Sequence, residues 1–115
     1  MEEKPNIIVD KIVNFSKKII NLYMELKNEK HYELASQLFR SGTSIGANVE
    51  EAQAAQSKKD FIAKMSISAK EARETRYWLR LIDETNISQK NIAAFFIDIN
   101  EIISILTKII KTSII

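Results

Sequence analysis

The sequence of 115 residues contains no cysteine, one proline, two glycines and one histidine. Without cysteine, neither disulfides nor thiolate metal sites can form. So few glycines and prolines leave little material for tight turns, which argues against an all-β fold. The single histidine, His31, has no second histidine to work with, and the Glu-x-x-His motif of di-iron bundles is missing. We therefore expect no catalytic residue, no metal and no cofactor, and the protein is predicted not to be an enzyme.

Long apolar runs are also missing, and no segment approaches the roughly 18 residues that a membrane span requires. The chain begins Met-Glu-Glu-Lys-Pro, with acidic residues where a signal peptide would carry positive charge. These features predict a cytoplasmic protein that does not interact with membranes. The net charge of +2 is too small to indicate nucleic-acid binding by itself.

Apolar residues instead recur at spacings of three and four, which is the pattern of amphipathic helices. The first such face comprises Ile8, Ile12, Phe15, Ile19, Leu22 and Leu26, and the second comprises Leu34, Leu38, Ile45, Val49 and Ala52. The third comprises Phe61, Met65, Ser68, Ala72, Thr75, Leu79 and Ile82, and the fourth comprises Ile92, Phe95, Ile99, Ile102, Leu106 and Ile109.

Short polar segments separate these faces, and two serines stand where helix caps are expected. Ser57, followed by Asp60, resembles a capping box, and Ser88 is predicted to cap the last helix. The predicted helices span about 6–27, 31–55, 58–85 and 89–112. Because short connections join only antiparallel neighbours, we predict one all-α domain over 1–115, an antiparallel up-down-up-down four-helix bundle.

The first and last helices carry additional apolar residues beside their main faces. These are Val9, Val13, Ile20 and Tyr23 in the first helix and Phe96, Ile103, Ile105 and Ile110 in the last. Such wide apolar arcs fit either a thick core or a surface buried between subunits. We favour a subunit interface for at least one of the two helices.

The second helix carries a polar stripe, bordered by Arg40, that is either solvent-exposed or a satisfied polar seam between helices. Gly42 and Gly46 stand four residues apart on another side of this helix, where they would let a neighbouring helix approach closely. A seam would involve Glu71 and Glu74 of the third helix, and we predict that Arg40 pairs with one of them. The stripe consists of Gln37, Ser41, Ser44, Asn48 and Glu51.

The segment from Ser36 to Ala52, SQLFRSGTSIGANVEEA, resembles the signature of the bacterial 23S ribosomal-RNA intervening-sequence proteins. The similarity continues through AQSKKDFI (55–62) and KEARETRYWL (70–79), about half of the chain. Relatives of this family include the accessory variability determinant of diversity-generating retroelements. Many members have Gly where this chain has Ala52.

The resemblance implies an antiparallel four-helix bundle, ring-shaped homopentamers and no enzymatic activity. The retroelement relatives bind nucleic acid and a reverse transcriptase, so the implied partners are further copies of this chain, RNA or DNA, and such a protein. The retroelement proteins are also more basic than this chain.

The best local candidate for nucleic-acid binding is a stripe of Arg73, Arg76 and Arg80 on the third helix. Lys70 or residues of another helix could join it, and Lys58, Lys59 and Lys64 form a second basic cluster near the start of the same helix. The stripe is either a solvated helical face or a ridge that contacts phosphates.

These features together predict a non-catalytic, homo-oligomeric helical bundle that binds nucleic acid, or a nucleic-acid-processing partner, through its basic faces. The alternative is a protein-only interaction scaffold. Tyr77 and Trp78 are adjacent and are predicted to point to different sides, with Trp78 as a packing anchor between helices or between subunits.

Overall fold

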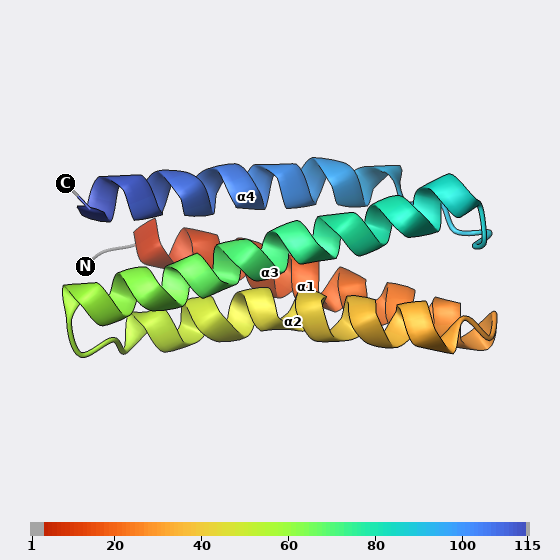
Figure 1. Cartoon of the computed structure of the whole chain (residues 1–115), viewed down its shortest axis with the longest axis horizontal. Coiled ribbons are helices and arrows are strands. Elements are labelled where there is room, and N and C mark those ends of the chain that lie inside the picture. The colour runs from red at the N-terminus through yellow and green to blue at the C-terminus, as the bar shows by residue number, and fades with distance from the viewer. Residues whose placement is uncertain (1–3, 115) are drawn as a thin grey trace.

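The computed structural model describes residues 4–114, and the side chains of residues 7–114. It consists of α1 (Lys4–Asn28), α2 (Tyr32–Gln53), α3 (Lys58–Thr85) and α4 (Ala93–Ile114). Consecutive helices run in opposite directions, and the start of α1 and the end of α4 lie at the same end of the molecule (Figure 1). The predicted all-α class and four-helix packing are confirmed.

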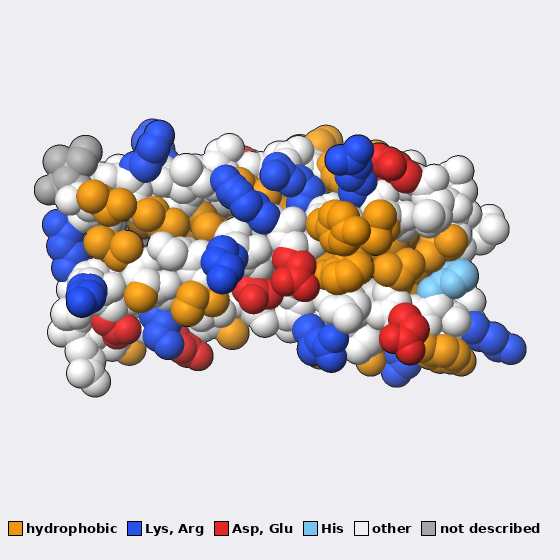
Figure 2. Space-filling view, in the orientation of Figure 1, with side chains coloured by type: hydrophobic (Ala, Val, Ile, Leu, Met, Phe, Trp, Pro, Cys, Tyr) orange, Lys and Arg blue, Asp and Glu red, His pale blue; other side chains and the backbone are white. Residues whose placement is uncertain are grey.

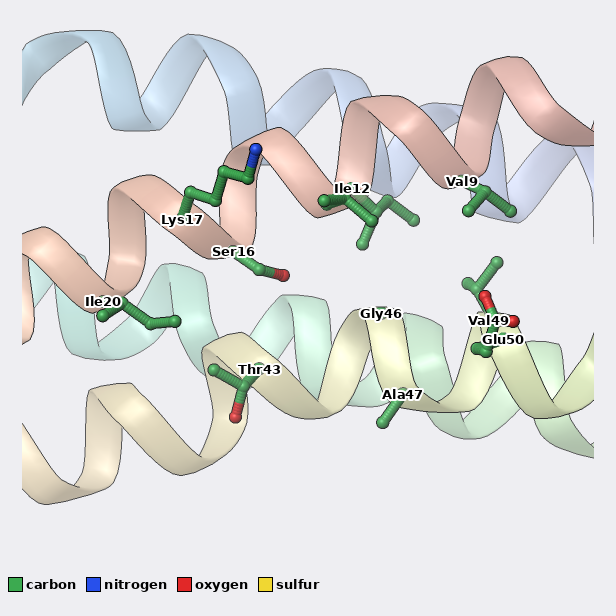
Figure 3. A pocket seen from close by; sticks show the side chains of 11 residues that line it. Val9, Ile12, Ser16, Lys17, Ile20, Thr43, Gly46, Ala47, Val49 and Glu50 are labelled. Atoms are coloured by element: carbon green, nitrogen blue, oxygen red, sulfur yellow. The ribbon is translucent and has the colours of Figure 1, made fainter.

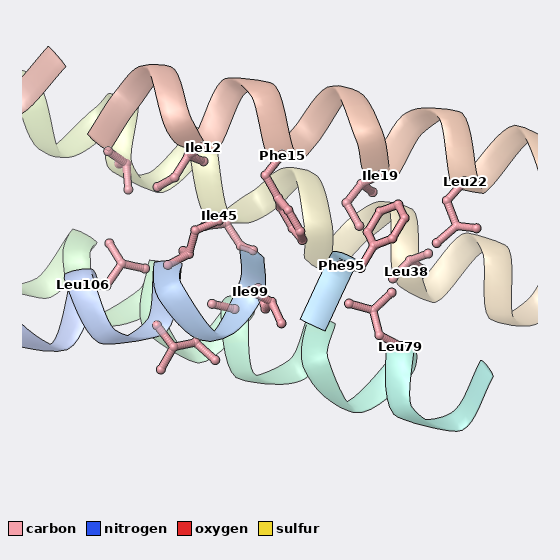
Figure 4. Packing of buried hydrophobic residues seen from close by; sticks show 14 of the residues in the cluster. Ile12, Phe15, Ile19, Leu22, Leu38, Ile45, Leu79, Phe95, Ile99 and Leu106 are labelled. Carbon is pink, nitrogen blue, oxygen red and sulfur yellow. The ribbon is translucent and has the colours of Figure 1, made fainter. Parts of the chain in front are cut away.

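The core is formed by the apolar faces that the sequence predicted. All six residues of the predicted α1 face are buried, and Phe15, Ile19 and Leu22 point into the bundle, toward α4 and the helices beyond (Figure 4). At the periphery, Leu34, Phe61 and Ile109 are only partly buried, although they pack against the core. The helical period therefore identified the buried side of every helix, and its errors fall at the ends of the helices.

The start of α3 is capped as predicted. The Ser57 side chain accepts a hydrogen bond of 3.0 Å from the backbone N–H of Asp60. The Asp60 carboxylate accepts one of 3.3 Å from the backbone N–H of Gln56, which precedes the cap. The two side chains therefore satisfy one amide of the first turn and one amide just before the cap.

The predicted start of α4 at residue 89, with Ser88 as its cap, is wrong, because the helix begins at Ala93. Ser88 Oγ accepts a hydrogen bond of 3.0 Å from the Lys90 amide, which holds a turn before the helix. Asn91 Oδ1 accepts a hydrogen bond of 3.0 Å from the Ala93 amide, so Asn91 caps the helix. Both residue types are good caps, and the local sequence does not distinguish between them.

Small side chains on α2 bring it close to α1. A Cβ atom added at Gly42 would lie 2.7 Å from Ile19 Cγ2, and one at Gly46 would lie 3.0 Å from Ile12 Cγ2. In the hollow between the two helices, Ile12 of α1 is directed toward the bare backbone of α2 at Gly46 (Figure 3). The glycines therefore set the distance between α1 and α2, as their spacing predicted.

A line of hydroxyl groups is buried between α2 and α3. Ser68 donates a hydrogen bond of 2.8 Å to the Ile45 carbonyl. Thr75 Oγ1 lies 3.0 Å from Ser41 Oγ and 2.8 Å from the Glu71 carbonyl oxygen. Buried hydroxyls are tolerated when they are hydrogen-bonded in this way, and their small size allows close helix packing. Of the predicted polar stripe, Ser41 belongs to this line.

The other polar residues of α2 are bonded differently. The Ser44 hydroxyl donates a hydrogen bond of 2.7 Å to the Arg40 carbonyl of the same helix. The Asn48 side-chain amide donates one of 2.9 Å to the Ser44 carbonyl. Gln37 is half-buried, and Glu51 forms an ion pair of 2.8 Å with Lys64 of α3. The stripe is therefore part seam and part exposed helical surface.

The predicted pairing of Arg40 with Glu71 or Glu74 is wrong. Arg40 is exposed and forms no ion pair with either carboxylate, all three residues being among those described. An exposed guanidinium is hydrated and does not need a carboxylate. Glu74 instead accepts a hydrogen bond of 3.1 Å from Trp78 Nε1. Burial, together with the nearby Glu74 carboxylate, raises the pKa of Glu71, while Lys70 opposes the shift.

We predict that Gly42→Ala destabilises the protein. Alanine gains about 1 kcal/mol of helix propensity, but overpacking against Ile19 costs about 1–3 kcal/mol, so the net loss reaches about 2 kcal/mol. Urea unfolding measures the difference. Gly46→Ala is the control, since its added Cβ meets Ile12 at the longer distance of 3.0 Å and should cost less. A Gly42→Ala variant as stable as the parent would show that the glycine does not set the helix distance.

We also predict that Glu71→Gln stabilises the protein at pH 7. Because the folded-state pKa of Glu71 is raised, ionisation of this carboxyl opposes folding as the pH rises through that pKa. The neutral amide removes this cost, so the advantage should vanish below the unfolded pKa of about 4.3. Thermal melts across pH test this. Glu50→Gln, at an exposed position of α2, is the control for the change in net charge. An advantage that is equal at all pH values would contradict the assignment.

Candidate nucleic-acid interface

Four cations from two helices line one side of the bundle, where α3 packs against α4. Lys70 and Arg73 come from α3, and Lys108 and Lys111 come from α4; together they define the basic groove. Two adjoining hollows of about 320 and 420 Å³ share Arg73, Thr107 and Lys111. All four cations are exposed. Several lysine and arginine side chains lie over α4 and beside α3 (Figure 2).

The acidic residues of α4 face away from this groove. Asp98 pairs with Lys18 of α1 at 2.8 Å, and Glu101 pairs with Lys11 of α1 at 2.7 Å. These are the two acidic residues of α4. Since both carboxylates form ion pairs with α1, they do not neutralise Lys108 and Lys111, which face α3.

Within the described part of the chain, the four cations of the basic groove form no ion pair. Hydroxyl groups of Ser66, Ser104 and Thr107 also line the hollows. Arginine and lysine bind phosphate by charge, and hydroxyls bind it by hydrogen bonds. The groove therefore offers both kinds of phosphate contact on one open surface.

The predicted arginine stripe has three different environments. Arg73 lines the basic groove. Arg76 donates a hydrogen bond of 2.8 Å to Asn100 Oδ1 of α4, a neutral partner that leaves its charge in place. Arg80 forms an ion pair of 2.7 Å with Glu84, whose hydrogen bond and charge raise the pKa of the guanidinium. Of the predicted stripe, Arg73 therefore lies in the groove with Lys70, Lys108 and Lys111, and Arg76 lies one turn further along α3.

The second predicted cluster is not part of the basic groove. Lys58 and Lys59 are exposed at the start of α3. Lys64 is turned to α2, where the hydrogen bond with Glu51 raises its pKa. Lys108 and Lys111 were missed by sequence reasoning. Their spacing of three places them on one side of α4, but it does not show that this side meets Arg73.

Tyr77 and Trp78 were predicted to point to different sides, and this is wrong for their rings. The ring centroids lie 5.1 Å apart, at an interplanar angle of 66°. Adjacent helical residues diverge by about 100° at the backbone, but large rings can turn back toward each other. Trp78 packs against the core, as predicted, and Tyr77 is exposed beside it.

The single histidine has a structural contact. His31 Nε2 lies 2.8 Å from the Ile87 carbonyl oxygen and so links the α1–α2 connection to the α3–α4 connection. Across residues 7–114, no group of three His, Asp or Glu side chains is placed to hold a metal. None of the four described helices combines the length and apolar character of a membrane span.

Comparison with known proteins adds two matches to this geometry. A family model described as 23S rRNA-intervening sequence protein matches residues 4–108. A crystal structure from Bacteroides thetaiotaomicron VPI-5482 is similar, with a TM-score of 0.87 and 45% sequence identity, over 94% of this chain and 98% of that chain. It is described as a protein with unknown function from the S23 ribosomal protein family. No curated protein matches this chain.

The family model covers nearly the whole bundle, including all three segments whose sequence carried the resemblance. This four-helix chain therefore belongs to the 23S rRNA-intervening sequence protein family.

Proposed function

We propose that this protein binds nucleic acid, without chemical conversion, through phosphate contacts in the basic groove. The observation that carries the proposal is the set of four unpaired cations that two helices bring together there. In contrast, the cations that α1 presents to α4 are paired with carboxylates. Lysine and arginine residues without carboxylate partners are available to displace counterions from a phosphate backbone.

The distribution of charge strengthens this proposal. The whole chain carries a formal net charge of only +2, so the rest of the molecule is net negative once the four groove cations are set apart. The groove therefore holds more than the net positive charge of the whole chain. Such asymmetry orients the encounter and confines contact to one side.

The family's name refers to 23S ribosomal RNA, which makes structured RNA the first probe. Phosphate contacts alone carry no sequence information, so duplex DNA is the second. Binding that depends on the groove should be sensitive to salt on both probes.

Self-association is the second part of the proposal, and it rests on the opposite side of the bundle. The hollow between α1 and α2 is about 430 Å³ and is mostly apolar. Val13 and Ile20 border it at 45% and 41% exposure, and Met24, one turn further along α1, is 54% exposed. Since, among the described helices, α1 does not pack against α3 and α2 does not pack against α4, the outer face of the α1–α2 pair lies across the bundle from that of the α3–α4 pair. A second copy could therefore cover this surface and leave the basic groove open. Light-scattering mass tests this part: more than one 13.2 kDa chain supports it, and a single chain contradicts it.

We predict that reversing three groove charges weakens binding. Arg73→Glu, Lys108→Glu and Lys111→Glu together should lower RNA affinity at low salt at least tenfold. They should also reduce the dependence of log K on log salt by about 0.7–0.9 for each phosphate that the protein no longer neutralises. Fluorescence anisotropy with labelled RNA and DNA, titrated across salt concentrations, measures both quantities.

The control is Lys27→Glu, Lys30→Glu and Arg40→Glu, which makes the same change in net charge at exposed positions of α1, the α1–α2 connection and α2. The control should retain most of the affinity. Equal weakening by both triple variants would mean that net charge alone drives binding. No binding of the parent protein to either probe at low salt would reject the proposed function.

A further inference from the structure

Beyond the basic groove, α3 carries an exposed aromatic ring in line with its cations. Tyr77 is 53% exposed, so more than half of its surface has no role in the core. It lies four residues after Arg73 and three before Arg80, and residues at these spacings share one face of a helix. A hydrophobic patch lies over the C-terminal half of α3, with basic side chains near it (Figure 2).

We propose that the groove binds single-stranded nucleic acid and that one unpaired base stacks on Tyr77. This inference rests on the proposed function, since the phosphates of the same strand would occupy the basic groove. Proteins that bind single strands combine a cationic track with aromatic side chains that accept bases. The face of α3 that contains Arg73 and Tyr77 places these two elements about one helical turn, or 5.4 Å, apart.

The Tyr77 ring is held in place by its surroundings. It contacts the ring of Trp78 edge to face, with centroids 5.1 Å apart. Trp78 is itself fixed by packing against the core and by its hydrogen bond of 3.1 Å to Glu74. An aromatic side chain ordered before binding loses little entropy when a base stacks on it.

The carboxylates near Tyr77 are already engaged. Glu74 accepts the hydrogen bond from Trp78, and Glu84 is paired with Arg80 at 2.7 Å. The charge of Arg80 reduces the repulsion that a phosphate would meet at Glu84, whereas the neutral indole of Trp78 leaves the charge of Glu74 in place. A duplex cannot use this platform in the same way, because its bases are stacked on one another and closed to an outside ring.

The test compares Tyr77→Ala with Tyr77→Phe, using a short oligouridylate and an RNA duplex as probes. Removing the stacking ring should weaken single-strand binding about 5- to 100-fold in Tyr77→Ala. Tyr77→Phe, which keeps the ring, should bind like the parent, and duplex affinity should not change. Tyr32→Ala removes a tyrosine of similar exposure, 58%, at the start of α2 and should have no effect. Circular dichroism melts check that each variant is folded.

Trp78 supplies a second readout because it is the only tryptophan. A base stacked on Tyr77 should change its fluorescence when oligouridylate binds. Single-strand binding that Tyr77→Ala leaves intact would overturn the inference and leave the proposed function standing. Equal weakening of single-strand and duplex binding, or equal weakening by Tyr77→Ala and Tyr77→Phe, would also overturn it. No binding of either probe to the parent would reject the proposed function as well.

Discussion

The close approach of α2 to both of its neighbours is the constraint on which the rest of the structure depends. Gly42 and Gly46 admit α1 until the backbone of α2 meets the side chains of Ile19 and Ile12. On its other side, Ser41 faces the buried hydroxyl of Thr75 on α3. Each glycine lowers the helix propensity of α2 by about 1 kcal/mol, so these tertiary contacts must sustain the helix.

Tight packing on both sides of α2 leaves the α1–α4 pair more widely spaced than the other neighbours. Large side chains fill this space, including Phe15 and Phe95, whose ring centroids lie 6.2 Å apart. At the surface the gap is bridged by long lysines that reach the carboxylates of α4. Asp98 and Glu101 of α4 thereby link this helix to α1, while Lys108 and Lys111 lie on the side of α4 that faces α3. The basic groove is in this sense a consequence of how the bundle is closed.

The sequence was sufficient to predict the four helices and their buried faces, because a period of 3.6 residues is read directly from residues such as Ile12, Ile19 and Leu26. It also predicted the Ser57 cap, whose hydrogen bond depends on residues three apart. It failed where two local solutions were equally good, as for Ser88 and Asn91 before α4. It failed again for Arg40, since the partner of an exposed side chain depends on tertiary geometry.

The candidate site was predictable only in part, for a similar reason. Arg73 was found from its spacing within one helix, but Lys108 and Lys111 come from a helix distant in sequence. Whether they meet Arg73 depends on how α4 is rotated about its axis, and ion pairs with α1 accompany that rotation. The contact of the Tyr77 and Trp78 rings likewise depends on side-chain torsions, which helical periodicity does not specify.

The central claim is that nucleic acid contacts the α3–α4 side of the bundle. The most direct test is photo-crosslinking of bound RNA, with the crosslinked peptides identified by mass spectrometry. We predict that crosslinks fall between Ser66 and Arg80 of α3 and between Ser104 and Lys111 of α4. Crosslinks concentrated on the outer face of the α1–α2 pair would contradict the account, because that face lies across the bundle from the groove between α3 and α4.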